Sequence, residues 1–223
     1  MTFNTNTKSI VIGGTAGIGK AVVTALSDRA GTVTAASRST GLDVTDEAAV
    51  ADYFATHGPV DHVIFTAGSS APGGAVTDVT TDAAKQAFDT KFWGSIAVAK
   101  AAAKHIKPGG TITLTSGFLA RRTIPGTYVK TAMNAALEAV TKILAKELAP
   151  IRVNVISPGL TDTDAYAGMP DDKRAAMLEN AAHSLPAGKA GAPEDLARGY
   201  LFAIDNPFVT GAVIDIDGGA LIN

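Results

Sequence analysis

Residues 12–19 read IGGTAGIG, and this stretch decides the fold of the chain. It follows the apolar run at 9–12 and leads into the helical pattern at 20–26, so it predicts a strand, a glycine turn and a helix. Such a turn presents backbone N–H groups at a helix N-terminus, where the partial positive charge favours a phosphate. Glycine is needed because a Cβ would block the approach of a pyrophosphate and the packing of helix on strand. The stretch therefore predicts a dinucleotide site.

The composition is that of an ordinary α/β domain. The 223 residues can bury a large core, and a net charge of −2 gives no support for a nucleic-acid or anionic-membrane partner. The sequence has no cysteine, which excludes disulfides and thiol chemistry, and its histidines lack metal-ligand spacing. The first residues are polar, and no apolar run reaches the ~18 residues of a membrane span. We expect a cytoplasmic protein without a bound metal.

Short apolar runs alternate with longer helical patterns along the chain. We predict strands at residues 9–13, 32–37, 62–66, 111–116, 152–157 and 213–217. We predict helices at residues 17–29, 46–57, 81–106, 125–148 and 193–204. The alternation predicts a parallel sheet with right-handed crossovers, in a single domain over residues 1–223.

Residues 160–191 break this alternation. Glycines and prolines are scattered through them, and Tyr166 and several aliphatic side chains give them apolar surface. Because ligands of doubly wound sheets are closed in beyond the carboxyl ends of the strands, we interpret the segment as a substrate lid. The alternative is a surface helical hairpin that packs on the core or on a neighbouring subunit.

Several motifs follow one another along the chain. They are the glycine turn, DVTD at 43–46, DHVIFTAG at 61–68, TLTS at 113–116, RVNVISPG at 152–159 and TGAVIDIDGG at 210–219. In this order they resemble the short-chain dehydrogenase/reductase superfamily. The resemblance covers essentially the whole chain and implies a Rossmann-type three-layer α/β sandwich with a parallel sheet of six to seven strands. It also implies a homodimer or homotetramer, because the helix at 132–148 often packs against its counterpart. Only residues 39–42 stand where the family usually fits a helix and most of a strand, so we expect that helix to be missing and the edge strand to be short or absent.

The resemblance also places the cofactor residues. They are Gly13, Thr15, Gly17, Ile18, Gly19, Ser37, Arg38, Asp43, Val44, Ala67, Gly68, Pro158, Gly159 and Thr161. The end of the second strand decides the cofactor, since an acidic residue there would bind the ribose 2′-OH and repel a 2′-phosphate. A guanidinium beside a hydroxyl suits a phosphate monoester, so Ser37 and Arg38 predict NADP(H) rather than NAD(H). The alternative is that Arg38 is only a solvated loop charge.

The catalytic pattern of the family is an Asn, a Ser, and a Tyr and a Lys four residues apart on one helix. Ser116 matches the Ser, but Tyr128 is followed by Ala132 at i+4, and no other tyrosine restores the pair. The helical sequence at 135–149 matches without a gap and fixes the register. In that register Lys130 takes the Tyr position, Asn134 takes the Lys position and Lys91 stands at the Asn position.

These replacements suggest an altered mechanism. We hypothesise that Lys130 donates the proton, that Ser116 orients the substrate oxygen and that Asn134 holds the ribose, because ammonium groups such as Lys91 and Lys130 lower each other's pKa. Alternatively both lysines bind phosphate or reach solvent. Tyr128 is a further candidate if the helix starts late, since in a regular helix it lies about 200° from Lys130.

The sequence thus predicts an NADP(H)-binding oxidoreductase that moves hydride to or from a small carbonyl or alcohol, an imine or an activated alkene. A non-catalytic NADP(H)-binding sensor or assembly protein is the alternative. The pair Arg121 and Arg122, just past Ser116, is interpreted as a solvated loop pair that could otherwise meet an anionic substrate or a partner subunit.

Overall fold

A parallel sheet forms the centre of the computed structural model, which describes residues 3–68 and 70–223. Within those residues the sheet has six strands in the order β2-β1-β3-β4-β5-β6. The strands are β1 (Lys8–Ile12), β2 (Thr32–Ala36), β3 (Val60–Phe65), β4 (Ile106–Thr115), β5 (Arg152–Pro158) and β6 (Val213–Ile216). The predicted Rossmann-type α/β fold is therefore confirmed, with strand ends that differ from the prediction by a few residues except at the start of β4.

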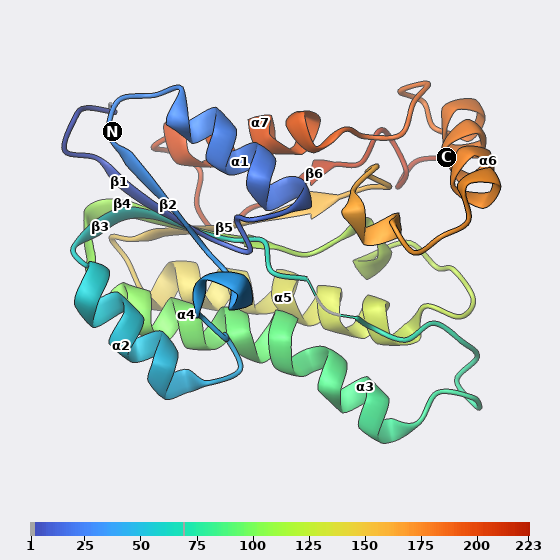
Figure 1. Cartoon of the computed structure of the whole chain (residues 1–223), viewed down its shortest axis with the longest axis horizontal. Helices are drawn as coiled ribbons and strands as arrows, with labels where there is room; N and C mark the ends of the chain where they lie inside the picture. Colours follow the sequence, from blue (N-terminus) through green and yellow to red (C-terminus); the bar gives the residue numbers. More distant parts are fainter. Residues whose placement is uncertain (1–2, 69) are drawn as a thin grey trace.

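Helices cover both faces of the sheet (Figure 1). On one face lie α1 (Gly17–Ser27) and α7 (Pro193–Asp205), and on the other lie α2 (Glu47–His57), α4 (Gly94–Ala103) and α5 (Tyr128–Glu147). Successive strand residues point to opposite faces, so each face has its own apolar core. In β1, Ile10 and Ile12 join the core that includes Phe54 of α2, whereas Val11 joins the core that includes Tyr200 of α7.

The connection between β2 and α2 is as short as the sequence suggests. A single 3₁₀ turn, η1 (Arg38–Thr40), replaces the helix, and Gly41 follows it with a φ of +94°. Because no strand lies outside β2 in the described sheet, β2 is the edge strand. The prediction of a missing helix is confirmed, and its consequence is that Arg38 and Asp43 lie on one short loop beside β1.

The long helix predicted at 81–106 is interrupted. It consists of α3 (Thr81–Phe88), a π-helical turn η2 (Asp89–Trp93) and α4, and the strand β4 already begins at Ile106. A π turn inserts an extra residue and occurs often at functional sites. Lys91 lies on this turn, and its carbonyl oxygen accepts from the Ser95 hydroxyl (2.5 Å).

Residues 160–191 form an arm that carries the short turn η4 (Asp164–Tyr166) and the helix α6 (Asp171–Ser184). The arm leaves the sheet after β5, and α6 lies at the end of the molecule where the chain terminates (Figure 1). Its two ends are held together, because the Asp162 N–H donates to the Gly191 carbonyl and the Gly191 N–H to the Leu160 carbonyl, both at 2.9 Å. The arm is thus a closed loop anchored at the carboxyl edge of the sheet.

Candidate functional site

The glycine turn lies where the strand order reverses, between the carboxyl ends of β1 and β3. Gly13 has a φ of +83°, and a Cβ there would stand 2.6 Å from the Ala67 amide nitrogen. Thr66, which replaces an asparagine of the family motif, uses its hydroxyl to bond the Ile12 carbonyl (2.9 Å) and so ties β3 to β1. With α1 beginning at Gly17, the turn leaves bare backbone facing a cleft at a helix N-terminus.

All but three of the predicted cofactor residues line this one cleft, which has a volume of about 380 Å³. The residues of the cleft that the sequence analysis predicted are Gly13, Thr15, Gly17, Ile18, Gly19, Ser37, Arg38, Asp43, Val44, Ala67 and Gly68. Residues that it missed include Leu42, Thr90 and the start of the arm at 163–165. The arm therefore borders the glycine turn. In the sequence, only the position of the arm after β5 could have indicated this contact.

Pro158, Gly159 and Thr161 do not line the cleft. They continue β5 towards the arm, where the Gly159 N–H donates to the Ile216 carbonyl (3.0 Å) and Thr161 pairs with Gly191. Thr161 is buried, and its hydroxyl donates to the Gly159 carbonyl (3.1 Å). In this structure the bonds of Gly159 and Thr161 tie the start of the arm to β6 and to Gly191.

At the end of the cleft formed by the loop after β2 lies a guanidinium, that of Arg38, without a hydrogen-bond or ion-pair partner in the described part of the protein. Arg38 is exposed, and its guanidinium makes no hydrogen bond or ion pair with another described residue. The Ser37 hydroxyl lies 3.1 Å from that of Thr15. Asp43 accepts from the N–H and the hydroxyl of Thr45, and these two bonds, followed by the positive charge of Arg38, lower the pKa of its carboxyl. A free guanidinium beside two hydroxyls, next to a turn that a Cβ would fill, fits the phosphate groups of a 2′-phosphorylated dinucleotide.

A lysine pair lies where η2 meets α5 and the end of β4, next in the chain to Thr90 of the cleft lining. The Lys91 ammonium donates to the Ser116 carbonyl oxygen and to Asn134 Oδ1, both at 2.7 Å. Burial, and after it the positive charge of Lys130, lowers the pKa of Lys91 to about 8. Lys130 itself is partly buried and has no hydrogen bond or ion pair with another described residue. The structure thus brings together Lys91, Ser116, Lys130 and Asn134, as the register implies.

The Ser116 hydroxyl faces the protein interior. Ser116 is only 3% exposed, and its hydroxyl donates to Glu138 Oε1 at 3.0 Å. Glu138 also accepts from Arg121 Nε (2.9 Å), and Arg121 is paired with Asp215 at the end of β6. Arg121 was interpreted as part of a solvated loop pair; its side chain is 38% exposed, but it is not only solvated, because its guanidinium bridges two carboxylates. Glu138 was missed, although its place four residues after Asn134 puts it on the same helix face.

Tyr128 is the first residue of α5, whose N-cap is Thr127. The helix therefore starts after residues 125–126, as the late-start alternative requires, but it includes Tyr128 itself. Two helical positions correspond to about 200° around the axis, so Tyr128 and Lys130 project from different sides of α5.

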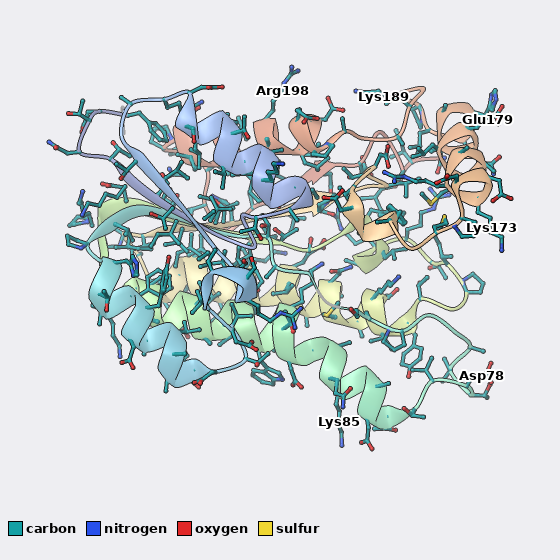
Figure 2. The ribbon with its side chains drawn as sticks, in the orientation of Figure 1. Asp78, Lys85, Lys173, Glu179, Lys189 and Arg198 are labelled. Atoms are coloured by element: carbon teal, nitrogen blue, oxygen red, sulfur yellow. The ribbon has the colours of Figure 1, made fainter. Side chains whose placement is uncertain are left out.

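A second, apolar recess of about 240 Å³ lies between the arm and the segment that follows β4. Phe118 and Ile124 line it from that segment, and Met177 and Leu185 line it from the arm. Arg122 is at its rim and donates to the Ala220 carbonyl and to the Asn223 side chain. On the outer side of α6, Lys173 and Glu179 point away from the body of the protein (Figure 2).

The described residues contain neither a candidate metal site nor a membrane-spanning helix. In residues 3–68 and 70–223 no group of His, Asp and Glu side chains is arranged to hold a metal ion. His62 is buried beside Thr111 (2.9 Å), and burial lowers its pKa to about 4. No helix of the described residues is long and apolar enough to cross a membrane.

A parallel sheet with a glycine turn at its switch point defines a Rossmann-type dinucleotide-binding protein. The family model described as enoyl-(acyl carrier protein) reductase matches residues 15–220. The short-chain dehydrogenase/reductase ucsE of Acremonium sp. is 30% identical over 249 residues, which cover 96% of this chain and 94% of that protein. The chain belongs to the short-chain dehydrogenase/reductase superfamily.

Two further relatives bear on the site. Carbonyl reductase family member 4 of Danio rerio is 30% identical over 236 residues, which cover 95% of this chain and 96% of that protein. A small-chain dehydrogenase whose crystal structure was determined in complex with NADPH is 56% identical, with a TM-score of 0.95 over 98% of this chain and all of that one.

Proposed function

We propose that this protein is an NADP(H)-dependent oxidoreductase that moves hydride between the nicotinamide and a small carbonyl or alcohol, an imine or an activated alkene. The observation that carries the cofactor assignment is Arg38, a guanidinium without a protein partner at the end of the cleft where a 2′-phosphate would lie. NADPH is also the cofactor in the crystal structure of the 56% identical relative. When bound, NADPH supplies the hydride.

Lys130 supplies the proton in this proposal. Reduction of a carbonyl adds a hydride to carbon and a proton to oxygen, so a neutral alcohol forms and the donor is left as a free amine. Lys130 occupies the family's Tyr position on α5, and its ammonium is not engaged by another described residue. Lys130 is partly removed from water, and it lies close enough to Lys91 for its positive charge to act on that ammonium, so a proton-bearing group stands beside the lysine that Ser116 and Asn134 hold. The altered active site proposed from the sequence therefore rests on this lysine.

Ser116 takes a supporting role in the proposal. Its hydroxyl is buried against Glu138, and its carbonyl oxygen holds Lys91. Orientation of a substrate oxygen, the role suggested from the sequence, would require that hydroxyl to leave Glu138. We therefore assign Ser116 to the support of the lysine pair.

The substrate class follows from the recess under the arm. Phe118, Ile124 and Met177 offer apolar contacts, and the small volume of the recess favours a small, largely apolar molecule. The arm at 160–191 would then act as the lid. A homodimer or homotetramer is proposed from the exposed Ile143 of α5 and the exposed Trp93, and the cytoplasmic location stays a prediction from the sequence.

The experiment is a screen of NADPH oxidation against small ketones, aldehydes, cyclic imines and enones, run with wild-type protein and Lys130→Met. We expect turnover with at least one class and its loss in the variant. If NADPH binds tightly and no substrate class of the screen oxidises it, the enzyme proposal fails and the result supports the non-catalytic alternative. If turnover is the same in Lys130→Met, the proton-donor assignment fails.

A further inference from the structure

Lys91 has one more hydrogen-bond donor than the protein uses. An ammonium carries three N–H groups, and two of them are taken by the Ser116 carbonyl and Asn134 Oδ1 at 2.7 Å. No other described residue accepts the third. Because partly buried donors are normally satisfied, the third N–H favours an acceptor from a bound molecule or water.

The position of Lys91 indicates which molecule that is. Thr90, the residue before it, lines the dinucleotide cleft, and Ser116 directly follows β4 at the carboxyl edge of the sheet. The adenine end of the cleft is at Ser37 and Arg38, on the other side of the glycine turn. Lys91 is therefore adjacent in the chain to a residue that lines the cleft, and it is bonded to the end of β4 at the carboxyl edge of the sheet, the edge at which a dinucleotide binds.

The residue types at the two positions are exchanged relative to the family pattern. In the register of the sequence, the Asn position holds Lys91 and the Lys position holds Asn134. The hydrogen bond between the two side chains shows that the exchanged pair meets at one place. One ammonium and one amide are thus kept at the site, but the ammonium now arrives from η2 rather than from α5.

From this geometry we infer that Lys91, and not Asn134, binds the ribose hydroxyls beside the nicotinamide, and that Asn134 is the positioning residue that aims the Lys91 ammonium. This inference rests on the proposed function, since it requires NADP(H) in the cleft. It reverses the role suggested for Asn134 from the sequence, because Asn134 is 5% exposed and its Oδ1 is already used by Lys91.

The test compares two ligands by isothermal titration calorimetry. NADPH fills both halves of the cleft, whereas adenosine 2′,5′-bisphosphate fills only the adenine half. Loss of a charge-assisted hydrogen bond is expected to weaken NADPH binding by roughly 10-fold or more in Lys91→Met, with binding of the bisphosphate unchanged. Lys85→Met is the matched control, because Lys85 on α3 points into solvent (Figure 2) and its loss should change neither affinity.

Reciprocal variants make the test independent of folding defects. The double variant Lys91→Asn with Asn134→Lys returns the ammonium to α5 and should recover most of the NADPH affinity lost in Lys91→Asn alone. Asn134→Asp keeps an acceptor for the Lys91 ammonium, so it should retain the NADPH affinity that Asn134→Leu loses. Thermal unfolding of each variant shows that the comparison is made between folded proteins.

The possible failures are distinguishable. If wild-type protein binds neither ligand, the proposed function falls and this inference falls with it. If wild-type protein binds both and Lys91→Met binds NADPH as tightly, the inference alone is overturned. It is also overturned if the folded double variant binds NADPH no better than Lys91→Asn.

Discussion

The two ends of the dinucleotide cleft differ in how closely they keep the pattern of the superfamily. At the adenine end the glycine turn, Arg38 and Ala67 stand where the resemblance places them. At the nicotinamide end our proposal places Lys91, Lys130 and Asn134 at the positions of the family's Asn, Tyr and Lys. The first end depends on bare backbone and on a turn that few residues can adopt, so it tolerates little change. The second needs only a proton and a positive charge at one place, and different side chains on different helices can supply them.

The largest effect is expected from a side chain in the glycine turn. Gly13→Ala puts a Cβ against the Ala67 backbone at a φ of +83° and should cost roughly 3 kcal/mol of unfolding free energy, together with NADPH affinity. Gly41→Ala is the matched control, because Gly41 also has a positive φ but a Cβ there meets nothing within 4 Å. Denaturant unfolding of both variants measures the difference. Equal losses would mean that the close approach of the turn to β3 is unimportant.

The next effect concerns the choice of cofactor. Arg38→Ala removes the guanidinium for the 2′-phosphate and should weaken NADPH binding by roughly 10- to 100-fold while leaving NADH binding nearly unchanged. Arg198→Ala controls for the lost charge, since Arg198 of α7 points away from the body (Figure 2). Dissociation constants for both cofactors decide the matter. Tighter binding of NADH than of NADPH by the wild-type protein would contradict the account of this end.

A pH dependence of stability is expected from the nicotinamide end. Burial lowers the pKa of Lys91 from 10.5 to about 8, so the unfolded chain binds more protons than the folded protein between these values. The free energy of unfolding of the wild-type protein, relative to that of Lys91→Met, should therefore rise as the pH increases from about 8 to 10.5. The expected rise is on the order of 2 kcal/mol for a partly screened ammonium. Urea unfolding across this range measures it. Parallel pH profiles for the two proteins would show that Lys91 titrates as in the unfolded chain.

The smallest effect is expected from Ser116. Ser116→Ala removes one hydrogen bond to Glu138, which keeps its bond to Arg121, so the loss should be about 1 kcal/mol with NADPH affinity unchanged. Thermal unfolding measures the loss of stability, and titration calorimetry measures the NADPH affinity. Unaltered stability with a large loss of turnover would instead make the Ser116 hydroxyl a substrate contact.

Most residues that line the cleft could be identified from the sequence because their features are local. A glycine turn, a short loop and Arg38 are close together in the chain, and their meaning depends on backbone geometry alone. The missing helix between Arg38 and Asp43 could be predicted for the same reason, since four residues cannot form it.

The nicotinamide end depends on contacts between distant segments. The hydrogen bond between Lys91 and Asn134 joins residues 43 positions apart, and the π turn that carries Lys91 has no simple sequence signal. Arg121 looked solvated because its partners Glu138 and Asp215 come from α5 and β6. Pro158, Gly159 and Thr161 lie outside the lining of the cleft because they continue β5 into the arm, and this course of the chain is not evident from the sequence.

The central claim is that the nicotinamide end uses Lys130 as its acid while the adenine end binds NADPH in the usual way. The direct test is the single-turnover rate of hydride transfer in Lys130→Met, measured with a substrate from the screen alongside the NADPH dissociation constant. Lys142→Met, an exposed lysine on the same helix, is the control. The account predicts a rate at least about 100-fold lower with little change in NADPH affinity. An unchanged rate in Lys130→Met, or an equal loss in Tyr128→Phe, would contradict it.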